Sequence, residues 1–288
     1  MGSKLDLIKR LLRTKQWIKN LFVFAPLVFA QKMFDIGSLI RVVVAALLFC
    51  LLTSCIYILN DVEDIAKDVT HPVKRLRPIA NGEISKKNAL WIVAILLPVA
   101  VLLGMCLGIN FGIVMVVYFL NNYLYSHFLK HMVIIDVMSI AIGFVLRVIG
   151  GAEVIDVYIS PWILMCTLFL ALFLGFSKRR SEITVLGINA IKFRENLEEY
   201  TVEFIDNMIS VVLAMTLVAY AMYTFFSQND VYVMTATVPL VIYGVFRYQY
   251  LVHRKNGGGS PEDTILSDKN LLTVIMLWVV MVMIAIYF

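Results

Sequence analysis

Carboxylate side chains recur at short intervals in one polar stretch of the chain. Asp61, Asp64 and Asp68 are separated by three and four residues, and Asn60 directly precedes them. In a helix of about 3.6 residues per turn, such positions share one face. Carboxylates on one face repel each other, and a divalent cation bound by their oxygens removes that repulsion; Mg²⁺ suits such ligands, with Mn²⁺ as an alternative. The spacing therefore predicts a metal site formed by Asn60 and the three aspartates, against the alternative of a solvated acidic loop.

Basic side chains follow these acids directly. Lys74, Arg75 and Arg77 lie between Pro72 and Pro78. Arginine matches phosphate oxygens two at a time, and lysine supplies a point charge. Membrane proteins collect basic residues in cytoplasmic loops, which accounts for the cations but not for the acids beside them. Acids that hold a metal, next to cations that hold phosphate, predict a diphosphate site.

Further charged residues stand near the ends of apolar stretches. Asp136 and Arg147 are eleven residues apart, about three helical turns, so a helix would place both on one face. Because charges inside a membrane are costly, the pair predicts a cavity or a partner. Lys130 is the only basic residue of a very short turn, and the segment 178–182 ends another apolar stretch, either as anchors or as phosphate ligands.

Long apolar stretches must position these polar residues. Of the 288 residues, 61% are hydrophobic and 16% are charged, whereas a soluble domain is roughly half apolar and a quarter charged. The excess falls into stretches of about 20 residues, the length of a transmembrane helix. We therefore expect an all-α integral membrane protein with a single domain over residues 1–288. The nine predicted spans are 18–34, 38–59, 89–107, 110–126, 132–152, 160–177, 205–226, 231–249 and 269–288.

The lysines and arginines fall almost entirely on one set of span ends. With the N-terminus inside and the C-terminus outside, Lys32 alone lies on the outer side, while Arg41 and Arg147 lie within spans. Such asymmetry is typical of cytoplasmic loops, and it accounts for the formal net charge of +5 without nucleic acid as a partner. The two long connections, 61–88 and 178–204, are then cytoplasmic. Function is expected in the membrane and on its inner rim.

Other kinds of chemistry find little support in the sequence. The four cysteines lie in apolar runs without metal-ligand spacing, as expected of small core residues. We expect no cleavable signal peptide in the charged residues 1–20, and no Ser-His-Asp set stands out. A transporter is an alternative from another class, but the acids gather on one side of the membrane and no inverted repeat is visible.

The polar motifs resemble those of a known family. The stretch 60–68, followed by 74–82, resembles the first signature of the UbiA superfamily of prenyltransferases. The resemblance covers nearly the whole chain in layout. It implies a bundle of nine transmembrane helices with a cavity on the cytoplasmic side and a Mg²⁺-bound diphosphate.

One segment departs from the aromatic prenyltransferases of that superfamily. They carry a second aspartate-rich motif after the sixth span, where this chain has the mostly basic segment 178–182. This segment, together with 15–20, 126–130 with Asp136, and 143–147, resembles the branch of polyprenyl-phosphate phosphoribosyltransferases, the decaprenylphosphoryl-5-phosphoribose synthase type. Phosphoribosyl diphosphate carries a 5-phosphate that a prenyl diphosphate lacks, and a basic cluster suits that phosphate.

The resemblance implies Mg²⁺-dependent transfer of 5-phosphoribose from phosphoribosyl diphosphate to a polyprenyl phosphate, such as decaprenyl phosphate, with release of diphosphate, in the synthesis of cell-envelope precursors. The alternative is a prenyltransferase that moves an isoprenoid onto an aromatic or other small acceptor. The implied catalytic residues are Asp61, Asp64, Asp68 and Lys130. The implied substrate ligands are Lys19, Lys74, Arg75, Arg77, Tyr125, Asp136, Arg147, Lys178, Arg179, Arg180, Glu182 and Arg194. The expected location is the cell (plasma) membrane, as a multi-pass protein among lipids with its active site on the cytoplasmic side; a homo-oligomer stays open.

Overall fold

The chain folds into helices. A computed structural model describes residues 4–70, 73–186, 197–226, 231–254 and 261–288, and throughout these ranges the regular structure is helical. This confirms the all-α fold class. The chain forms two compact units: Met1–Ser126 with Leu146–Tyr158, and His127–Val145 with Ile159–Phe288. The division falls inside α7 (Ile135–Ile155).

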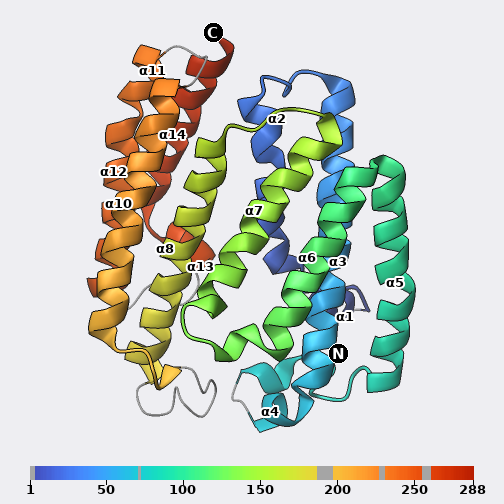
Figure 1. Cartoon of the computed structure of the whole chain (residues 1–288). Coiled ribbons are helices and arrows are strands. Elements are labelled where there is room, and N and C mark those ends of the chain that lie inside the picture. Colours follow the sequence, from blue (N-terminus) through green and yellow to red (C-terminus); the bar gives the residue numbers. More distant parts are fainter. Residues whose placement is uncertain (1–3, 71–72, 187–196, 227–230, 255–260) are drawn as a thin grey trace. The chain divides into compact units, whose positions relative to one another are not determined.

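The first unit is built around α3 (Ile36–Glu63), a helix of 28 residues. Asp35 caps its N-terminus, because its carboxylate accepts hydrogen bonds from the hydroxyl of Ser38 at 2.6 Å and from the N–H groups of Ser38 and Gly37 at 3.2 Å. These bonds lower the pKa of Asp35, the Ser38 hydroxyl most of all. α5 (Lys86–Leu107) packs along α3 (Figure 1). The other elements of this unit are α1 (Lys4–Leu11), η1 (Thr14–Phe24), α2 (Ala25–Phe29), α4 (Ile65–Thr70), η2 (Lys74–Leu76) and α6 (Ile109–His127).

The first predicted span is not one long α-helix. Residues 14–24 form the 3₁₀-helix η1, unusually long for its type, and α2 follows directly. The backbone of η1 comes so close to α7 that a Cβ on Gly151 would overlap the carbonyl oxygen of Val23. Glycine at position 151 is therefore what allows η1 to pack here.

The second unit is built around α8 (Pro161–Leu186) and α10 (Val202–Phe226), which pack along each other. Phe173 of α8 and Ile205 and Ile209 of α10 are almost fully enclosed in its apolar core. Proline starts α8, where its missing N–H costs nothing. The remaining elements are η3 (Leu129–His131), the first half of α7, α11 (Val231–Ala236), α12 (Val238–Arg254), α13 (Pro261–Ser267) and α14 (Lys269–Tyr287).

Seven helices among the described residues are long and apolar enough to cross a membrane: Ile36–Glu63, Lys86–Leu107, Ile135–Ile155, Pro161–Thr184, Val202–Phe226, Val231–His253 and Lys269–Tyr287. Large apolar side chains on them stay exposed, such as Leu47, Trp91 and Ile95, which suits contact with lipid. α6 is long enough, but Asn110, Asn121 and Asn122 reduce its apolar character. Nine spans therefore remain a prediction.

Candidate functional site

The acidic motif lies where α3 ends, and an arginine bridges two of its carboxylates. The Nη1 atom of Arg77 donates to Oδ1 of Asp61 at 3.1 Å and to Oδ2 of Asp68 at 2.5 Å. Asp61 and Asp68 are only 2% and 1% exposed. Two enclosed carboxylates thus converge on one cation.

The predicted continuous helical face is wrong, because α3 stops at Glu63. Asp64 leaves the helical conformation (φ −88°, ψ 9°), and α4 starts at Ile65. Acidic residues at a helix C-terminus oppose the helix dipole, which gives a physical reason for the break. The break turns the chain so that Asp61 and Asp68 meet through Arg77, while Asp64, which is half-buried, makes no ion pair with any described residue.

Arg13 also belongs to this cluster, and the sequence reasoning missed it. Its guanidinium forms an ion pair with Asp61 and lies 4.8 Å from the centre of the Tyr57 ring. Tyr57 and Asp61 are one helical turn apart, so Arg13 follows one face of α3. The sequence signal was ambiguous, because a basic residue before the first span is also what membrane orientation requires.

A salt bridge fastens α1 to the basic loop. Arg10 donates two hydrogen bonds to the carboxylate of Glu83, at 3.1 and 2.6 Å, and one to the carbonyl oxygen of Leu76 at 3.3 Å. The bond from Arg10 lowers the pKa of Glu83, and that carboxylate raises the pKa of Arg10. The helix that leads to Arg13 is thereby tied to the loop that carries Arg77.

Asn60 and Arg147 make polar contacts elsewhere in the first unit. The hydroxyl of Ser126 donates to Oδ1 of Asn60 at 2.8 Å. Arg147 is buried on α7, donating from Nε to Oδ1 of Asn20 at 2.8 Å and from Nη2 to the hydroxyl of Tyr118 at 2.6 Å. Arg147 therefore joins α7 to η1 and α6 within the first unit.

A second polar network lies in the second unit, at the start of α7 and the end of α8. Nε of Arg179 donates to Oδ2 of Asp136 at 2.9 Å, and its Nη1 donates to Glu182 at 2.6 Å. The hydroxyl of Tyr200 donates to Oδ1 of Asp136 at 2.8 Å and accepts the N–H of Ile134 at 2.7 Å. Burial raises the pKa of Tyr200 well above its usual value, so the phenol keeps its proton and remains a donor.

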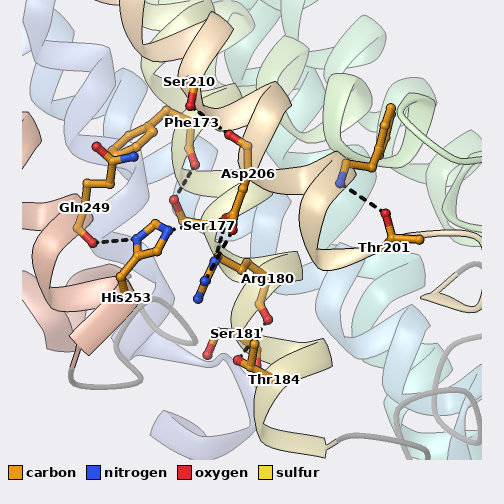
Figure 2. A network of polar contacts seen from close by, with 11 residues as sticks. Phe173, Ser177, Arg180, Ser181, Thr184, Thr201, Asp206, Ser210, Gln249 and His253 are labelled. Carbon is orange, nitrogen blue, oxygen red and sulfur yellow. Dashed lines mark hydrogen bonds and ion pairs between the residues drawn. The ribbon is translucent and has the colours of Figure 1, made fainter.

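A third network joins Arg180 of α8 to α10 and α12. Nε of Arg180 donates to Oδ1 of Asp206 at 2.6 Å, and Nε2 of His253 lies 3.4 Å from the same oxygen. Figure 2 shows the three side chains pointing toward one another, with Nδ1 of His253 directed at the carbonyl oxygen of Gln249, 2.9 Å away. Asp206 therefore holds the end of α8 against its neighbours.

The predicted residues thus fall into separate groups. Asp61, Asp68 and Arg77 meet in one cluster, and Asp136, Arg179 and Glu182 meet in another. Asp136 and Arg147 both lie on α7, as expected, but they form hydrogen bonds with different partners. Arg75 is exposed, and the partly exposed candidates are Lys19, Lys74, Tyr125, Lys130 and Lys178. Arg194 lies outside the described residues.

The donor set at the end of α3 is compatible with a divalent metal ion, although its present geometry is not that of a metal site. Carboxylate and amide oxygens are the ligands that Mg²⁺ prefers. Within the described ranges, no three or more His, Cys, Asp or Glu side chains are grouped as metal ligands. Oxygens of Asp61 and Asp68 instead converge on the Nη1 atom of Arg77. The two carboxylates already hold the positively charged guanidinium of Arg77. A divalent metal ion could therefore replace part of this contact and bind the same oxygens.

Solved structures with the same fold define the class of protein. A UbiA homolog from Archaeoglobus fulgidus, bound to DMAPP and Mg²⁺, matches with a TM-score of 0.75 at 19% identity, over 96% of this chain and 98% of that chain. The same homolog bound to GPP and Mg²⁺ matches with a TM-score of 0.74 at 19% identity, over 98% and 100%. The fold is that of a multi-pass membrane protein, and the apolar helices agree with it.

Sequence comparison then gives the family. The model of the UbiA prenyltransferase family matches residues 21–264. The chain belongs to this family and is a membrane-embedded transferase, as the motifs predicted.

Curated relatives are similar over nearly their whole length. A decaprenyl-phosphate phosphoribosyltransferase of Mycolicibacterium smegmatis is 32% identical, over 96% of this chain and 91% of the relative. A protein of the same name from Mycobacterium tuberculosis strain H37Rv is 30% identical, over 98% and 94%. The similarity supports the phosphoribosyltransferase branch that the motifs resembled.

Proposed function

We propose that this protein transfers 5-phosphoribose from phosphoribosyl diphosphate to a polyprenyl phosphate and releases diphosphate. The single observation that carries this proposal is the near full-length similarity to proteins named decaprenyl-phosphate phosphoribosyltransferase. The end of α8 supports it, because the chain has the basic segment 178–182 where aromatic prenyltransferases of the superfamily carry a second acidic motif. A 5-phosphate needs cations, and a second carboxylate cluster would repel it.

The reaction needs a leaving diphosphate and an anionic nucleophile. An oxygen of the lipid phosphate attacks the anomeric carbon, and the bond from that carbon to the diphosphate oxygen breaks. The nucleophile is already an anion, so no strong base is required. Positive charge develops on the sugar, as in glycoside chemistry, while negative charge grows on the leaving group.

The residues at the end of α3 are assigned to the diphosphate. Asn60, Asp61, Asp64 and Asp68 would hold Mg²⁺ or Mn²⁺, which would neutralise charge on the departing diphosphate. Lys74, Arg75 and Arg77 bind the diphosphate oxygens, while Arg77 contacts the two aspartates through Nη1.

The residues of the second unit are assigned to the remaining phosphates. Lys130, Lys178 and Arg180 bind the 5-phosphate or the lipid phosphate. Arg179 is enclosed and bonded to Asp136 and Glu182, so it contributes charge and holds the end of α8 in place. Lys19, Tyr125, Arg147 and Arg194 complete the proposed set of substrate ligands.

The proposed topology is a single UbiA-like domain with nine spans, the N-terminus inside and the C-terminus outside. The seven apolar helices supply most of these spans, while η1 with α2 and the amide-containing α6 supply the other two. The distribution of lysine and arginine supports an active site on the cytoplasmic side of the plasma membrane. The lipid acceptor then enters from the bilayer, between helices.

The proposal is tested with the purified protein, Mg²⁺, a polyprenyl phosphate and phosphoribosyl diphosphate, with diphosphate release and the lipid product as readouts. Lipid-dependent release together with a phosphoribosylated lipid is the expected result. Absence of release, with turnover instead of a prenyl diphosphate and an aromatic acceptor, would overturn the donor assignment and leave the family assignment in place.

A further inference from the structure

The acidic cluster at the end of α3 is balanced in charge by two arginines. Asp61 is paired with Arg13 and Arg77, and Asp68 is paired with Arg77. Because both carboxylates are almost fully enclosed, their interaction with the guanidinium groups is little screened by water. Two formal negative charges thus face two formal positive charges.

This balance has a consequence for metal binding. Arg13 and Arg77 both contact Oδ1 of Asp61. A divalent cation that takes this oxygen as a ligand must displace at least one guanidinium, and the displaced positive charge stays near the added metal charge. Without further anions, the exchange is opposed by repulsion between cations. A diphosphate removes the opposition, because its oxygens accept hydrogen bonds from the released arginine and cancel the added charge.

Arg13 is the arginine best placed to make this exchange. Arg77 bonds to both carboxylates, whereas Arg13 bonds to Asp61 alone and also lies over the ring of Tyr57. The aromatic face gives its guanidinium a second favourable contact when Asp61 is occupied. Asp64 is half-buried and makes no ion pair with a described residue.

We propose that Arg13 competes with the metal ion for Asp61, and so makes metal binding depend on diphosphate. This inference rests on the metal site of the proposed function and adds an order to it: metal and diphosphate bind together, and the free metal binds weakly. By linkage, the metal must then raise the affinity for diphosphate by the same factor.

The test measures Mn²⁺ binding to the purified full-length protein by the electron paramagnetic resonance signal of free Mn²⁺, with and without inorganic diphosphate. Arg13→Gln is expected to bind Mn²⁺ alone about tenfold more tightly than the wild type, since a charge-assisted competitor is removed. In this variant, diphosphate is also expected to increase the Mn²⁺ affinity much less than it does in the wild type. Arg10→Gln is the matched control, because it removes the same charge from a residue that pairs with Glu83 and Asp6 instead.

The outcomes separate the inference from the proposed function. Tighter Mn²⁺ binding in Arg13→Gln but not in Arg10→Gln supports the competition. Equal affinities in these two variants would overturn the inference, and loss of Mn²⁺ in Asp61→Asn would then still support the metal site. If Asp61→Asn binds Mn²⁺ like the wild type, the metal role of the cluster fails, and the competition fails with it.

A conservative substitution guards against effects of misfolding. Arg13→Lys keeps a positive charge beside Asp61 and is expected to stay within about twofold of the wild-type Mn²⁺ affinity, since repulsion between positive charges is what opposes the metal. If Arg13→Lys increased the Mn²⁺ affinity as much as Arg13→Gln does, the argument from charge would be contradicted.

Discussion

The Nε atom of Arg179 donates a hydrogen bond of 2.9 Å to Oδ2 of Asp136, and neither side chain is more than 2% exposed. This pair joins the start of α7 to the end of α8. Asp136→Asn removes one of the two carboxylates that Arg179 contacts and leaves Glu182 as the other, which should cost about 1.5–3 kcal/mol of unfolding free energy. Asp206→Asn is the control, because the Arg180–Asp206 pair is 13% and 35% exposed and should be worth at most about 1 kcal/mol. Unfolding in detergent checks both; equal losses would contradict this account.

Tyr200 should position the turn that carries Lys130. Its hydroxyl links Asp136 to the N–H of Ile134, whose positive φ of 70° is strained for a β-branched residue. Tyr200→Phe removes a hydrogen bond to a charged group, so kcat/KM for the donor should fall about tenfold. The pH profile should not change, because burial keeps the phenol protonated. Tyr243→Phe, on an exposed face of α12, should behave like the wild type.

Asp64→Asn should abolish Mg²⁺-dependent turnover while expression and insertion stay normal. Asp64 caps α3, is half-buried and makes no ion pair with a described residue, so its loss should hardly disturb the fold. Diphosphate release across a Mg²⁺ titration, with a chelator as blank, measures the effect. Glu63→Gln makes the same change of charge at the exposed neighbouring position and should retain turnover. Substantial activity in Asp64→Asn would end the metal role of this residue.

Gly151→Ala should weaken the packing of η1 against α7. The added methyl group would overlap the backbone of Val23, which cannot move without shifting η1. A loss of about 1–3 kcal/mol follows from such overpacking, seen as a lower unfolding temperature. Gly244→Ala in α12 is the control, because the nearest atoms to its new methyl group lie 3.9 Å away, and alanine is the better helix former. A comparable loss in both variants would mean that the close approach is not the cause.

The Arg10–Glu83 pair should stabilise the N-terminal region above about pH 4.5 and lose its effect in acid. Arg10 holds the pKa of Glu83 below its ordinary value of 4.5, so this contribution is present above that value and disappears as the pH falls through the lowered one. The unfolding temperature of Glu83→Gln should be slightly below that of the wild type at pH 7, and the difference should vanish once the pH falls below the lowered pKa of Glu83. A difference that persists in acid would point to packing instead.

The sequence identified the acidic and the basic motif, but it predicted their arrangement in space only in part. The stretch 60–68 was expected as one helical face, but α3 ends at Glu63 and the chain turns. A spacing rule assumes a regular helix, and it gives no signal for a break caused by acids at a helix end. Arg13 is far from Asp61 along the chain, so only the folded structure could bring the two together.

The sequence by itself determined the membrane class, the helical fold and the family. Composition, apolar stretches of about 20 residues and the motif at 60–82 are local properties, because lipid requires each span to satisfy its own backbone hydrogen bonds. The tertiary structure decided which charges meet: Arg13 and Arg77 with Asp61, Arg179 with Asp136, and Arg180 with Asp206. Such pairs depend on how helices pack and where each one ends. An ionic contact requires the two charged groups to lie within a few ångströms of each other, and the order of residues along the chain does not directly encode that distance.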